Sequence, residues 1–475
     1  LSYAISFYLK KKHMKSVLIG KDTRKSSNFI EKIIVNELLN SGINVYLVGV
    51  TSTPAISLLT RKKKANIGVV ISASHNPYQY NGLKFFDHNG KKLSFKDENI
   101  IERNYFTRSI NKTSNKESFV NKGKMHKISP RVSEKIYKKK IKSSIGRLSL
   151  KGLKIIIDCA NGSTCKLVKN VFSNLGATLI IINNKPNGFN INKNCGSLYP
   201  RNIIRNVKKK SAHFGISFDG DGDRLICCDE KGNIINGDHI LAFIIKYKNY
   251  SKLFNDYGKG IVGTLMSNIS LENFLKGNKI NFFRANVGDR YVYDLMNKKK
   301  CNIGGEQSGH IIFKKILPCG DGILTAMQLL SVLKKSKKKS SELFNLYEPS
   351  FQIQKNVKIR DSNILNNKKM NNLMNFYNNK SFGSKRVLIR PSGTEPVIRV
   401  LVEGENFSII KTLANKIQRK ISSFWNTLIP TISYEIYSVV NLQHIVDIFK
   451  LLLWLYNIMR IIENILQYVV IMYNY

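Results

Sequence analysis

The chain has 475 residues, a net charge of +46 and a hydrophobic content of 43%. It can form a real core, and its length suits about three domains of roughly 150 residues. Its seven cysteines have no paired metal-ligand spacing, which excludes a zinc knuckle and indicates reduced thiols in a cytoplasmic protein. Because Lys occurs in every segment, we expect no nucleic-acid partner, but the positive field should attract an anionic substrate.

The first 90 residues alternate predicted strands with predicted helices. The helical spacing of apolar residues over 29–39 ends at Gly42, where a helix stop is expected. Thr53-Pro54 opens another helix, since Pro fits the first turn. Apolar strands are predicted at 16–20, 43–49 and 67–72. This β-α-β-α-β order implies a parallel sheet covered by helices.

The same pattern begins again near Leu153 and near Gly260, so the chain is predicted to contain three α/β units of similar size. A shorter unit follows over about 350–424 and closes with an amphipathic helix around 409–421. The Lys-rich segments 109–127 and 333–340 are predicted to be solvated loops or linkers.

The two ends of the sequence are unusual. No secretory signal is expected, because the charges follow the first apolar stretch instead of preceding it. From Ser433 onward the chain is aromatic and aliphatic, but its charge-free windows of about 9–12 residues fall short of the roughly 20 that a membrane-spanning helix needs. A docking helix or an unselected tail is therefore favoured over a membrane span.

Two segments that follow predicted strands carry groups suited to phosphoryl chemistry. Ser74 lies in SASHNP, where a hydroxyl at a tight turn can act as a nucleophile or carry a phosphate, and Lys84 brings a cation back toward this loop. In DGDGDR, the carboxylates of Asp219, Asp221 and Asp223 alternate with glycines and can converge on one hard cation. A turn with a local hydrogen bond remains the alternative for the Ser74 segment.

Two further segments suit a sugar and an anion. Glu306, Ser308 and His310 lie on a glycine-rich loop and offer partners for hydroxyl groups. In RPSGTEP, with Arg399 nearby, backbone N–H groups, hydroxyls and guanidinium groups can form an anion cradle. A nucleophile, a metal site, a sugar clamp and a phosphate clamp together indicate phosphoryl transfer.

In this order and at these separations, the four motifs resemble those of the α-D-phosphohexomutase family over about residues 1–425. SASHNP is similar to the family's phosphoserine loop, DGDGDR to its magnesium loop, GEQSGH to its sugar loop and RPSGTEP to its phosphate loop. The resemblance implies that Ser74 is phosphorylated, and that the phosphoserine with Asp219, Asp221 and Asp223 binds one Mg²⁺. It further implies that Arg224 and Lys84 flank the transferring group and that His310 is a candidate for proton transfer. The substrate-binding residues that it implies are Glu306 and Ser308 for the sugar, and Arg390, Ser392, Gly393, Thr394 and Arg399 for the phosphate that is not reacting.

The resemblance also implies an α/β fold in which three related α/β units, with mixed, largely parallel sheets, and a smaller α+β C-terminal domain surround a central cleft. We place the four domains at 1–128, 129–237, 238–346 and 347–427, with an atypical hydrophobic tail at 428–475. The family's opening motif, similar to GTDGIRG and carrying a catalytic-site Arg, is absent, so the first domain is expected to be truncated.

Within the family, the segments ISASHNPYQYNGLKFF, IDCANGST, ANVGDRYV and GGEQSGHII are most similar to enzymes that interconvert glucosamine 6-phosphate and glucosamine 1-phosphate for amino-sugar cell-wall precursors. The alternative branch acts on mannose or glucose phosphates and usually has Met at the position of Gln307. A degenerate or nucleic-acid-binding protein is the alternative from another class. The expected partner is a small sugar phosphate, with a possible homodimer and no membrane span.

Overall fold

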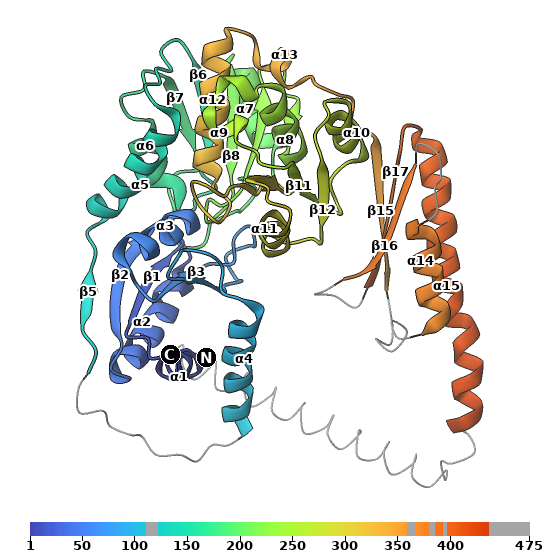
Figure 1. The fold of residues 1–475 in the computed structure, drawn as a ribbon, viewed down its shortest axis with the longest axis horizontal. Coiled ribbons are helices and arrows are strands. Elements are labelled where there is room, and N and C mark those ends of the chain that lie inside the picture. The colour runs from blue at the N-terminus through green and yellow to red at the C-terminus, as the bar shows by residue number, and fades with distance from the viewer. Residues whose placement is uncertain (111–121, 359–366, 380–384, 393–396, 437–475) are drawn as a thin grey trace, which may run out of the picture. The chain divides into compact units, whose positions relative to one another are not determined.

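A computed structural model describes residues 1–110, 122–358, 367–379, 385–392 and 397–436, with the side chains of 107–110 and 424–436 left out. The chain divides into two compact units, Leu1–Ser350 and Phe351–Tyr475 (Figure 1). Within the described ranges, the first unit contains three sheets and the second contains one. The expected α/β fold with a smaller α+β C-terminal domain is confirmed, and the domain boundaries at 128, 237 and 346 stay predictions.

The first sheet has the strand order β4-β3-β1-β2-β5, in which only β4 is antiparallel to its neighbour. Its two faces are covered by different helices. Val17 and Ile19 of β1 pack with α1 and α2, whereas Leu18 lies in the core that includes α3. The elements are α1 (Ser2–Lys11), β1 (Ser16–Lys21), α2 (Lys25–Asn40), β2 (Asn44–Val50), α3 (Thr53–Lys63), β3 (Ile67–Ile71), β4 (Leu83–Asp87), α4 (Phe95–Ile110) and β5 (Met125–Lys127).

The second sheet has the order β10-β9-β8-β6-β7, with β6, β7 and β8 parallel and the hairpin strands β9 and β10 antiparallel. Its parallel strands are apolar because helices cover them on both sides. The elements are α5 (Pro130–Ile145), β6 (Lys154–Asp158), α6 (Thr164–Phe172), β7 (Thr178–Ile182), α7 (Arg201–Lys209), β8 (Phe214–Phe218), β9 (Leu225–Asp229) and β10 (Ile234–Ile235).

The third sheet has the order β12-β11-β13-β14, again with an antiparallel strand, β14, at one edge. Its elements are α8 (Gly237–Lys246), the 3₁₀ helix η1 (Lys248–Tyr250), α9 (Lys252–Asn255), β11 (Ile261–Thr264), α10 (Ile269–Gly277), β12 (Phe282–Ala285), α11 (Asp289–Lys298), β13 (Ile303–Gly305), β14 (Ile311–Phe313), α12 (Gly322–Ser336) and α13 (Ser340–Phe344). Residues 322–333 of α12 are all buried, as expected for a helix that is apolar on every side. One apolar core contains residues of all three sheets, including Leu18, Ile155 and Ile261.

The three sheets share one topological feature that positions the chemistry. In each, one parallel strand turns into an antiparallel strand that follows it in the chain and pairs with it: β3 into β4, β8 into β9, and β13 into β14. The three loops that make these turns contain Ser74, the aspartates of DGDGDR, and the GEQSGH segment. The motifs found in the sequence therefore occupy the same position in three related units.

The second unit is a three-stranded antiparallel sheet, β15-β17-β16, with α14 and α15 packed on it (Figure 1). Ile410, Ala414, Ile417 and Ile421 of α15 are buried at helical spacing, which confirms the predicted amphipathic helix. The elements are β15 (Phe351–Lys358), α14 (Lys368–Asn379), β16 (Arg386–Pro391), β17 (Val397–Gly404) and α15 (Phe407–Ile436).

The structure corrects three local predictions. The Lys-rich segment 109–127 was expected to be a loop, but β5 forms at its end, since an edge strand needs only backbone partners from β2. The segment 333–340 is mostly helical, because α12 continues to Ser336 and α13 begins at Ser340. In α2, the apolar residues Phe29 and Ile33 are 68% and 46% exposed, so they do not contribute to the core.

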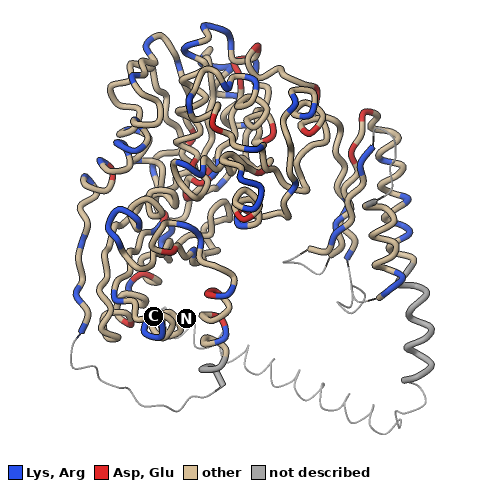
Figure 2. The backbone as a smooth tube through the Cα atoms, viewed as in Figure 1, with Lys and Arg blue, Asp and Glu red and all other residues tan. Residues whose placement is uncertain are grey.

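Lys and Arg residues occur along all parts of the described backbone and are not confined to one arm (Figure 2). Among the described residues, no helix combines the length and the apolar character needed to cross a bilayer. The hydrophobic tail after Ile436 lies outside the described residues, and its interpretation stays a prediction.

Candidate active site

Ser74 lies in the loop after β3 with its hydroxyl directed at the magnesium loop. Its Oγ donates a hydrogen bond to Asp219 Oδ2 at 2.7 Å, and its backbone N–H donates to Ser72 Oγ at 2.9 Å. The residue has φ +52, in the left-handed region that residues other than glycine rarely adopt, and it is 8% exposed. A strained, nearly buried hydroxyl beside a carboxylate is typical of a functional position.

Asp219, Asp221 and Asp223 form a buried carboxylate cluster. One oxygen from each lies within 4.8 Å of the others, a spacing that suits a shared metal ion. Asp221 Oδ1 and Asp223 Oδ1 are buried without a hydrogen-bond partner among the described residues. Burial and the two neighbouring carboxylates raise the pKa of Asp219 well above its usual value. Unpaired hard oxygen atoms in a buried anionic cluster fit a divalent cation such as Mg²⁺.

Lys84 partly compensates the charge of this cluster. It extends from β4, and its Nζ lies 2.5 Å from Asp221 Oδ2 and 2.9 Å from Asp223 Oδ2. Burial disfavours the ammonium form, but the neighbouring aspartates outweigh it and raise the pKa of Lys84, so the side chain stays cationic. Burial likewise opposes ionisation of Asp223, yet Lys84, His310 and Arg224 hold its pKa well below its usual value.

Arg224 closes the magnesium loop and faces the Ser74 loop. Its backbone N–H donates to Asp219 Oδ1 at 3.1 Å, and its Nη1 lies 3.2 Å from Nδ1 of His75. Burial and the adjacent Arg224 lower the pKa of His75, so the imidazole is neutral and can accept this hydrogen bond. The guanidinium thus lies next to the predicted phosphoserine.

His310 is buried behind the carboxylate cluster. Its Nδ1 lies 3.7 Å from Asp223 Oδ2 and its Nε2 lies 3.6 Å from Asp289 Oδ2, while the N–H of Gly320 donates to Nε2 at 2.9 Å. Burial lowers the pKa of His310, but Asp223 and Asp289 outweigh it and raise the pKa overall. The N–H of Gly320 opposes this, because it donates to an unprotonated Nε2. The ring therefore contacts a predicted metal ligand, and its role in proton transfer stays a prediction.

The sugar loop is held in a tight turn between β13 and β14. Glu306 Oε1 accepts a hydrogen bond from the N–H of Gly288 at 3.1 Å, and the backbone O of Glu306 accepts from Gly309 at 2.9 Å. Ser308 at the tip is exposed. Gly309 O accepts from the N–H of Leu225, the residue after Arg224, at 3.2 Å, which places the sugar loop beside the magnesium loop.

Arg390 and Arg399 of the predicted phosphate clamp lie in the second unit, on β16 and β17. Arg390 and Arg399 are cross-strand partners, and the N–H of Ser392 donates to Val397 O at 2.9 Å. Burial and the like charge of Arg399 lower the pKa of Arg390. Two adjacent guanidinium groups are suited to an anion. Gly393 and Thr394 lie outside the described residues.

Sequence reasoning missed four residues around the site. The Thr53 hydroxyl, at the start of α3, donates to Asp221 Oδ2, and Asp289 lies against His310. Arg24 and Asn192 donate to backbone carbonyl groups of the Ser74 loop. The polar Thr53-Pro54 helix start was a usable signal for Thr53, and the ANVGDRYV segment was one for Asp289. Arg24 and Asn192 occur in segments without a chemical motif.

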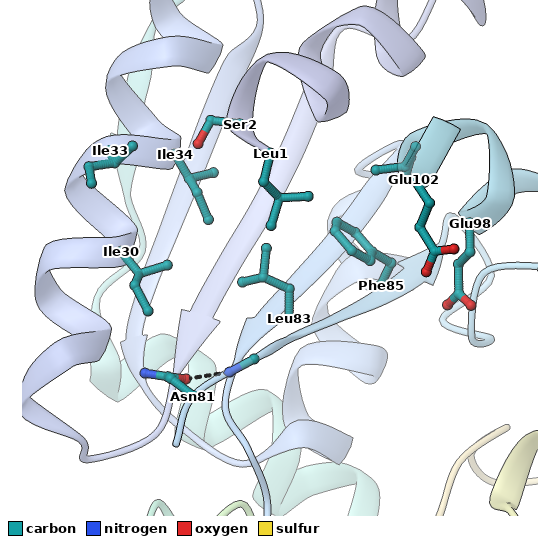
Figure 3. A pocket seen from close by; sticks show the side chains of 12 residues that line it. Leu1, Ser2, Ile30, Ile33, Ile34, Asn81, Leu83, Phe85, Glu98 and Glu102 are labelled. Atoms are coloured by element: carbon teal, nitrogen blue, oxygen red, sulfur yellow. Dashed lines mark hydrogen bonds between the residues drawn. The ribbon is translucent and has the colours of Figure 1, made fainter. Parts of the chain in front are cut away.

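An apolar cavity of about 520 Å³ lies on the first sheet, apart from the carboxylate cluster (Figure 3). Ile30 and Ile33 of α2 face Leu83 and Phe85 of β4 across it, and Asn81 lies at one end. Neither Ser74 nor the aspartates of the magnesium loop line it, so this cavity is distinct from the phosphoryl site.

Comparison with known families matches all three sheets and the C-terminal unit. The matches are to phosphoglucomutase/phosphomannomutase, alpha/beta/alpha domain I over residues 1–112, domain II over 134–232, domain III over 236–350, and the C-terminal domain over 356–420. The chain belongs to this family, the phosphohexomutases, which confirms the resemblance of the four motifs.

Curated relatives are similar over nearly their whole length. A phosphoglucosamine mutase of Campylobacter curvus is 41% identical over 421 residues, which are 88% of this chain and 93% of the relative. One from Pelagibacter ubique is 42% identical over 416 residues, 87% of this chain and 92% of the relative. A solved phosphoglucomutase/phosphomannomutase family protein from Burkholderia thailandensis has the same fold, with a TM-score of 0.74 at 21% identity over 89% of this chain and 92% of that one.

Proposed function

We propose that this chain is a phosphoglucosamine mutase, an isomerase that interconverts glucosamine 6-phosphate and glucosamine 1-phosphate. The names of the relatives at 40–43% identity support this substrate. The observation that carries the chemistry is the 2.7 Å hydrogen bond from Ser74 Oγ to Asp219, inside a carboxylate cluster suited to a metal. Synthesis of amino-sugar cell-wall precursors is the process that would use this reaction.

The proposed reaction has two half-reactions. In the first, a substrate hydroxyl oxygen bonds to phosphorus and the bond between phosphoserine Oγ and phosphorus breaks. The substrate hydroxyl loses its proton, and Ser74 Oγ gains one. The product is a sugar bisphosphate with an unphosphorylated serine. The bisphosphate then turns over, so that its other phosphate faces Ser74. In the second half-reaction, Ser74 Oγ bonds to that phosphorus, the bond between the phosphorus and the sugar oxygen breaks, and the serine proton moves to the sugar oxygen. Positioning and charge neutralisation supply most of the rate in such transfers.

The side chains around Ser74 have distinct parts in this proposal. Asp219, Asp221, Asp223 and the phosphoserine would hold one Mg²⁺, which when bound neutralises charge on the transferring phosphoryl group. Lys84 pairs with Asp221, and Arg224 lies next to His75 in the Ser74 loop, so both side chains add positive charge near Ser74. Glu306 and Ser308 bind the sugar, and the arginine pair at Arg390 and Arg399 binds the phosphate that is not reacting.

The proposal extends to the cellular location and the oligomeric state of the enzyme. A cytoplasmic location fits the seven cysteines, all of which are buried free thiols. A homodimer is compatible with it and is tested by the mass of the protein in solution.

The first test concerns Ser74. Phosphopeptide mass spectrometry of the active protein should find phosphate on Ser74, and Ser74→Ala should remove nearly all turnover, because no acceptor oxygen remains. Ser26→Ala, which changes an exposed hydroxyl bonded to Asn81, is the matched control and should retain activity. A fully active Ser74→Ala protein would exclude the covalent mechanism.

A second test concerns the sugar. A site that pairs the 2-amino group should discriminate against an analogue that lacks it by several kcal/mol. We therefore expect kcat/KM to be higher for glucosamine 1-phosphate than for glucose 1-phosphate. Equal values, or a preference for glucose, would assign the chain to the phosphomannomutase/phosphoglucomutase branch.

A further inference from the structure

The buried guanidinium of Arg24 binds the backbone of the Ser74 loop. The side chain has no exposed surface, and its Nε donates to Asp22 Oδ2 at 2.9 Å. Nη2 donates to the carbonyl O of Ser74 at 2.9 Å and of Asn76 at 3.0 Å. Nη1 donates to Asn76 O at 3.0 Å and Pro77 O at 2.8 Å. Because Asp22 neutralises the charge and carbonyl groups occupy the remaining donors, Arg24 is not available to bind a phosphate.

Asn192 reaches the same carbonyl groups from a different part of the molecule. It lies between β7 and α7 of the second sheet, and its Nδ2 donates to Ser74 O at 2.8 Å and to Asn76 O at 2.9 Å. A Cβ at Gly220 of the magnesium loop would lie 2.6 Å from Ser74 O and 2.8 Å from Asn192 Nδ2. The carbonyl of Ser74 is therefore enclosed by Arg24, Asn192 and the backbone of the magnesium loop.

This enclosure fixes the direction of the Ser74 side chain. At φ +52 the residue is in a conformation that an unconstrained serine seldom keeps. The hydrogen bonds to its carbonyl oppose rotation of the peptide plane, and that plane sets where Cβ and Oγ point. With the carbonyl held, Oγ stays 2.7 Å from Asp219 Oδ2.

We propose that Arg24 and Asn192 are positioning residues for the phosphoserine. They hold the backbone carbonyls of Ser74 and Asn76 so that Oγ, with or without its phosphoryl group, keeps one position beside the magnesium loop through both half-reactions. This inference rests on the proposed function of Ser74 as the phosphoryl carrier. It assigns a role to two side chains that touch neither the substrate nor the reacting atoms.

Loss of a positioning contact should affect turnover more than substrate binding. A displacement of about 1 Å at a reacting group can reduce a rate by about 10²-fold. We expect Asn192→Ala and Arg24→Lys to lower kcat by roughly 10- to 100-fold and to change KM by less than about threefold, since the sugar and phosphate contacts lie on other loops. In the absence of substrate, the phosphate on Ser74 should also hydrolyse at a different rate in these two variants than in the parent.

The experiment measures kcat, KM, thermal stability and, by intact mass, the lifetime of the phosphoserine for the parent and each variant. Arg284→Lys is the matched control, because Arg284 also pairs with a carboxylate, Glu272, and donates to two backbone carbonyls, but in the third sheet. Asn192→Ala removes no charge, so it tests the role even where Arg24→Lys fails to fold.

The outcomes separate the two proposals. A selective loss of kcat and an altered phosphoserine lifetime in Asn192→Ala and Arg24→Lys, with Arg284→Lys losing only stability, support the positioning role. Unchanged kcat and lifetime in Asn192→Ala, or losses equal to those of Arg284→Lys, overturn it while the parent remains an active phosphoenzyme. A parent without phosphate on Ser74 and without mutase activity contradicts the proposed function, and the positioning role with it.

Discussion

The carboxylate of Asp221 makes different contacts through its two oxygens. Oδ2 accepts from Thr53 and Lys84, whereas Oδ1 is buried without a described hydrogen-bond partner. We expect Asp221→Asn to weaken Mg²⁺ binding at least tenfold, because loss of an outer-shell partner alone costs about 10- to 100-fold. Turnover should fall in parallel.

Titration calorimetry with Mg²⁺ on metal-stripped protein measures this change. Asp97→Asn, on α4 and paired with Lys12, serves as the control and should bind Mg²⁺ like the parent. Full activity after removal of metal by a chelator would show that the carboxylate cluster has another purpose.

Residues differ in how far their roles can be predicted from sequence. The clustering of Asp219, Asp221 and Asp223 was predictable because the three carboxylates come from one short segment, and their binding of a metal stays a prediction. Arg24 and Asn192 were not, because their partners are backbone carbonyls, which carry no sequence signal and come close only in the folded chain.

At the scale of elements, the contact between the sugar loop and the magnesium loop depends on one glycine. Gly309 has φ +90, and a Cβ there would lie 1.8 Å from Leu225 O. Gly309→Ala should therefore destabilise the fold by about 2 kcal/mol or more and reduce activity, since the loop must move. Gly277→Ala, at the end of α10 with nothing within 4 Å of the new Cβ, should be close to neutral. Thermal unfolding of both variants checks this; equal stability would contradict the close contact.

A second element-level prediction concerns the start of α13. Glu230 accepts hydrogen bonds from Ser340 Oγ at 2.6 Å and from the N–H of Ser341 at 2.9 Å. Burial opposes ionisation, but these bonds outweigh it and lower the pKa of Glu230 from 4.5 to about 2. A depressed carboxylate pKa stabilises the folded state above the unfolded value, and this stabilisation is lost as pH falls from about 4.5 toward 2.

The melting temperature measured across this pH range tests the contact. Glu230→Gln should be less stable than the parent at pH 6, and the difference should shrink as the pH falls. Glu102→Gln, on the exposed part of α4, should follow the parent at every pH. A constant difference between Glu230→Gln and the parent would contradict the assigned pKa.

At the scale of elements, the strands that could be predicted from the sequence are those whose side chains are buried. Buried parallel strands such as β3 and β8 are continuous apolar runs, so they were readily found. The edge strand β5 has only exposed side chains and the sequence of a loop, because its pairing with β2 uses the backbone alone. Phe29 and Ile33 fit a helical spacing, yet Phe29 is exposed and Ile33 lines a cavity instead of the core.

The whole molecule has a net charge of +46, and its Lys and Arg residues are distributed over the described backbone (Figure 2). A protein built to bind nucleic acid concentrates such charge and loses affinity steeply with salt. We expect filter binding of duplex DNA to be weak at physiological ionic strength and insensitive to sequence. Tight binding at that salt concentration would favour the nucleic-acid alternative.

The same charge should act on the substrate, a sugar phosphate anion. A positive field raises the local concentration of an anion, and salt screens that field beyond about 10 Å at 0.1 M. We therefore expect kcat/KM to fall severalfold as ionic strength rises from about 0.01 to 0.3 M, mainly through KM. The value of kcat at saturating substrate is the internal control, because the bound phosphate is proposed to contact Arg390 and Arg399 at short range, where screening is weak. A kcat/KM that does not change with salt would show that the excess Lys has no part in substrate capture. A parallel fall in kcat would indicate that salt acts on the fold or on the metal site.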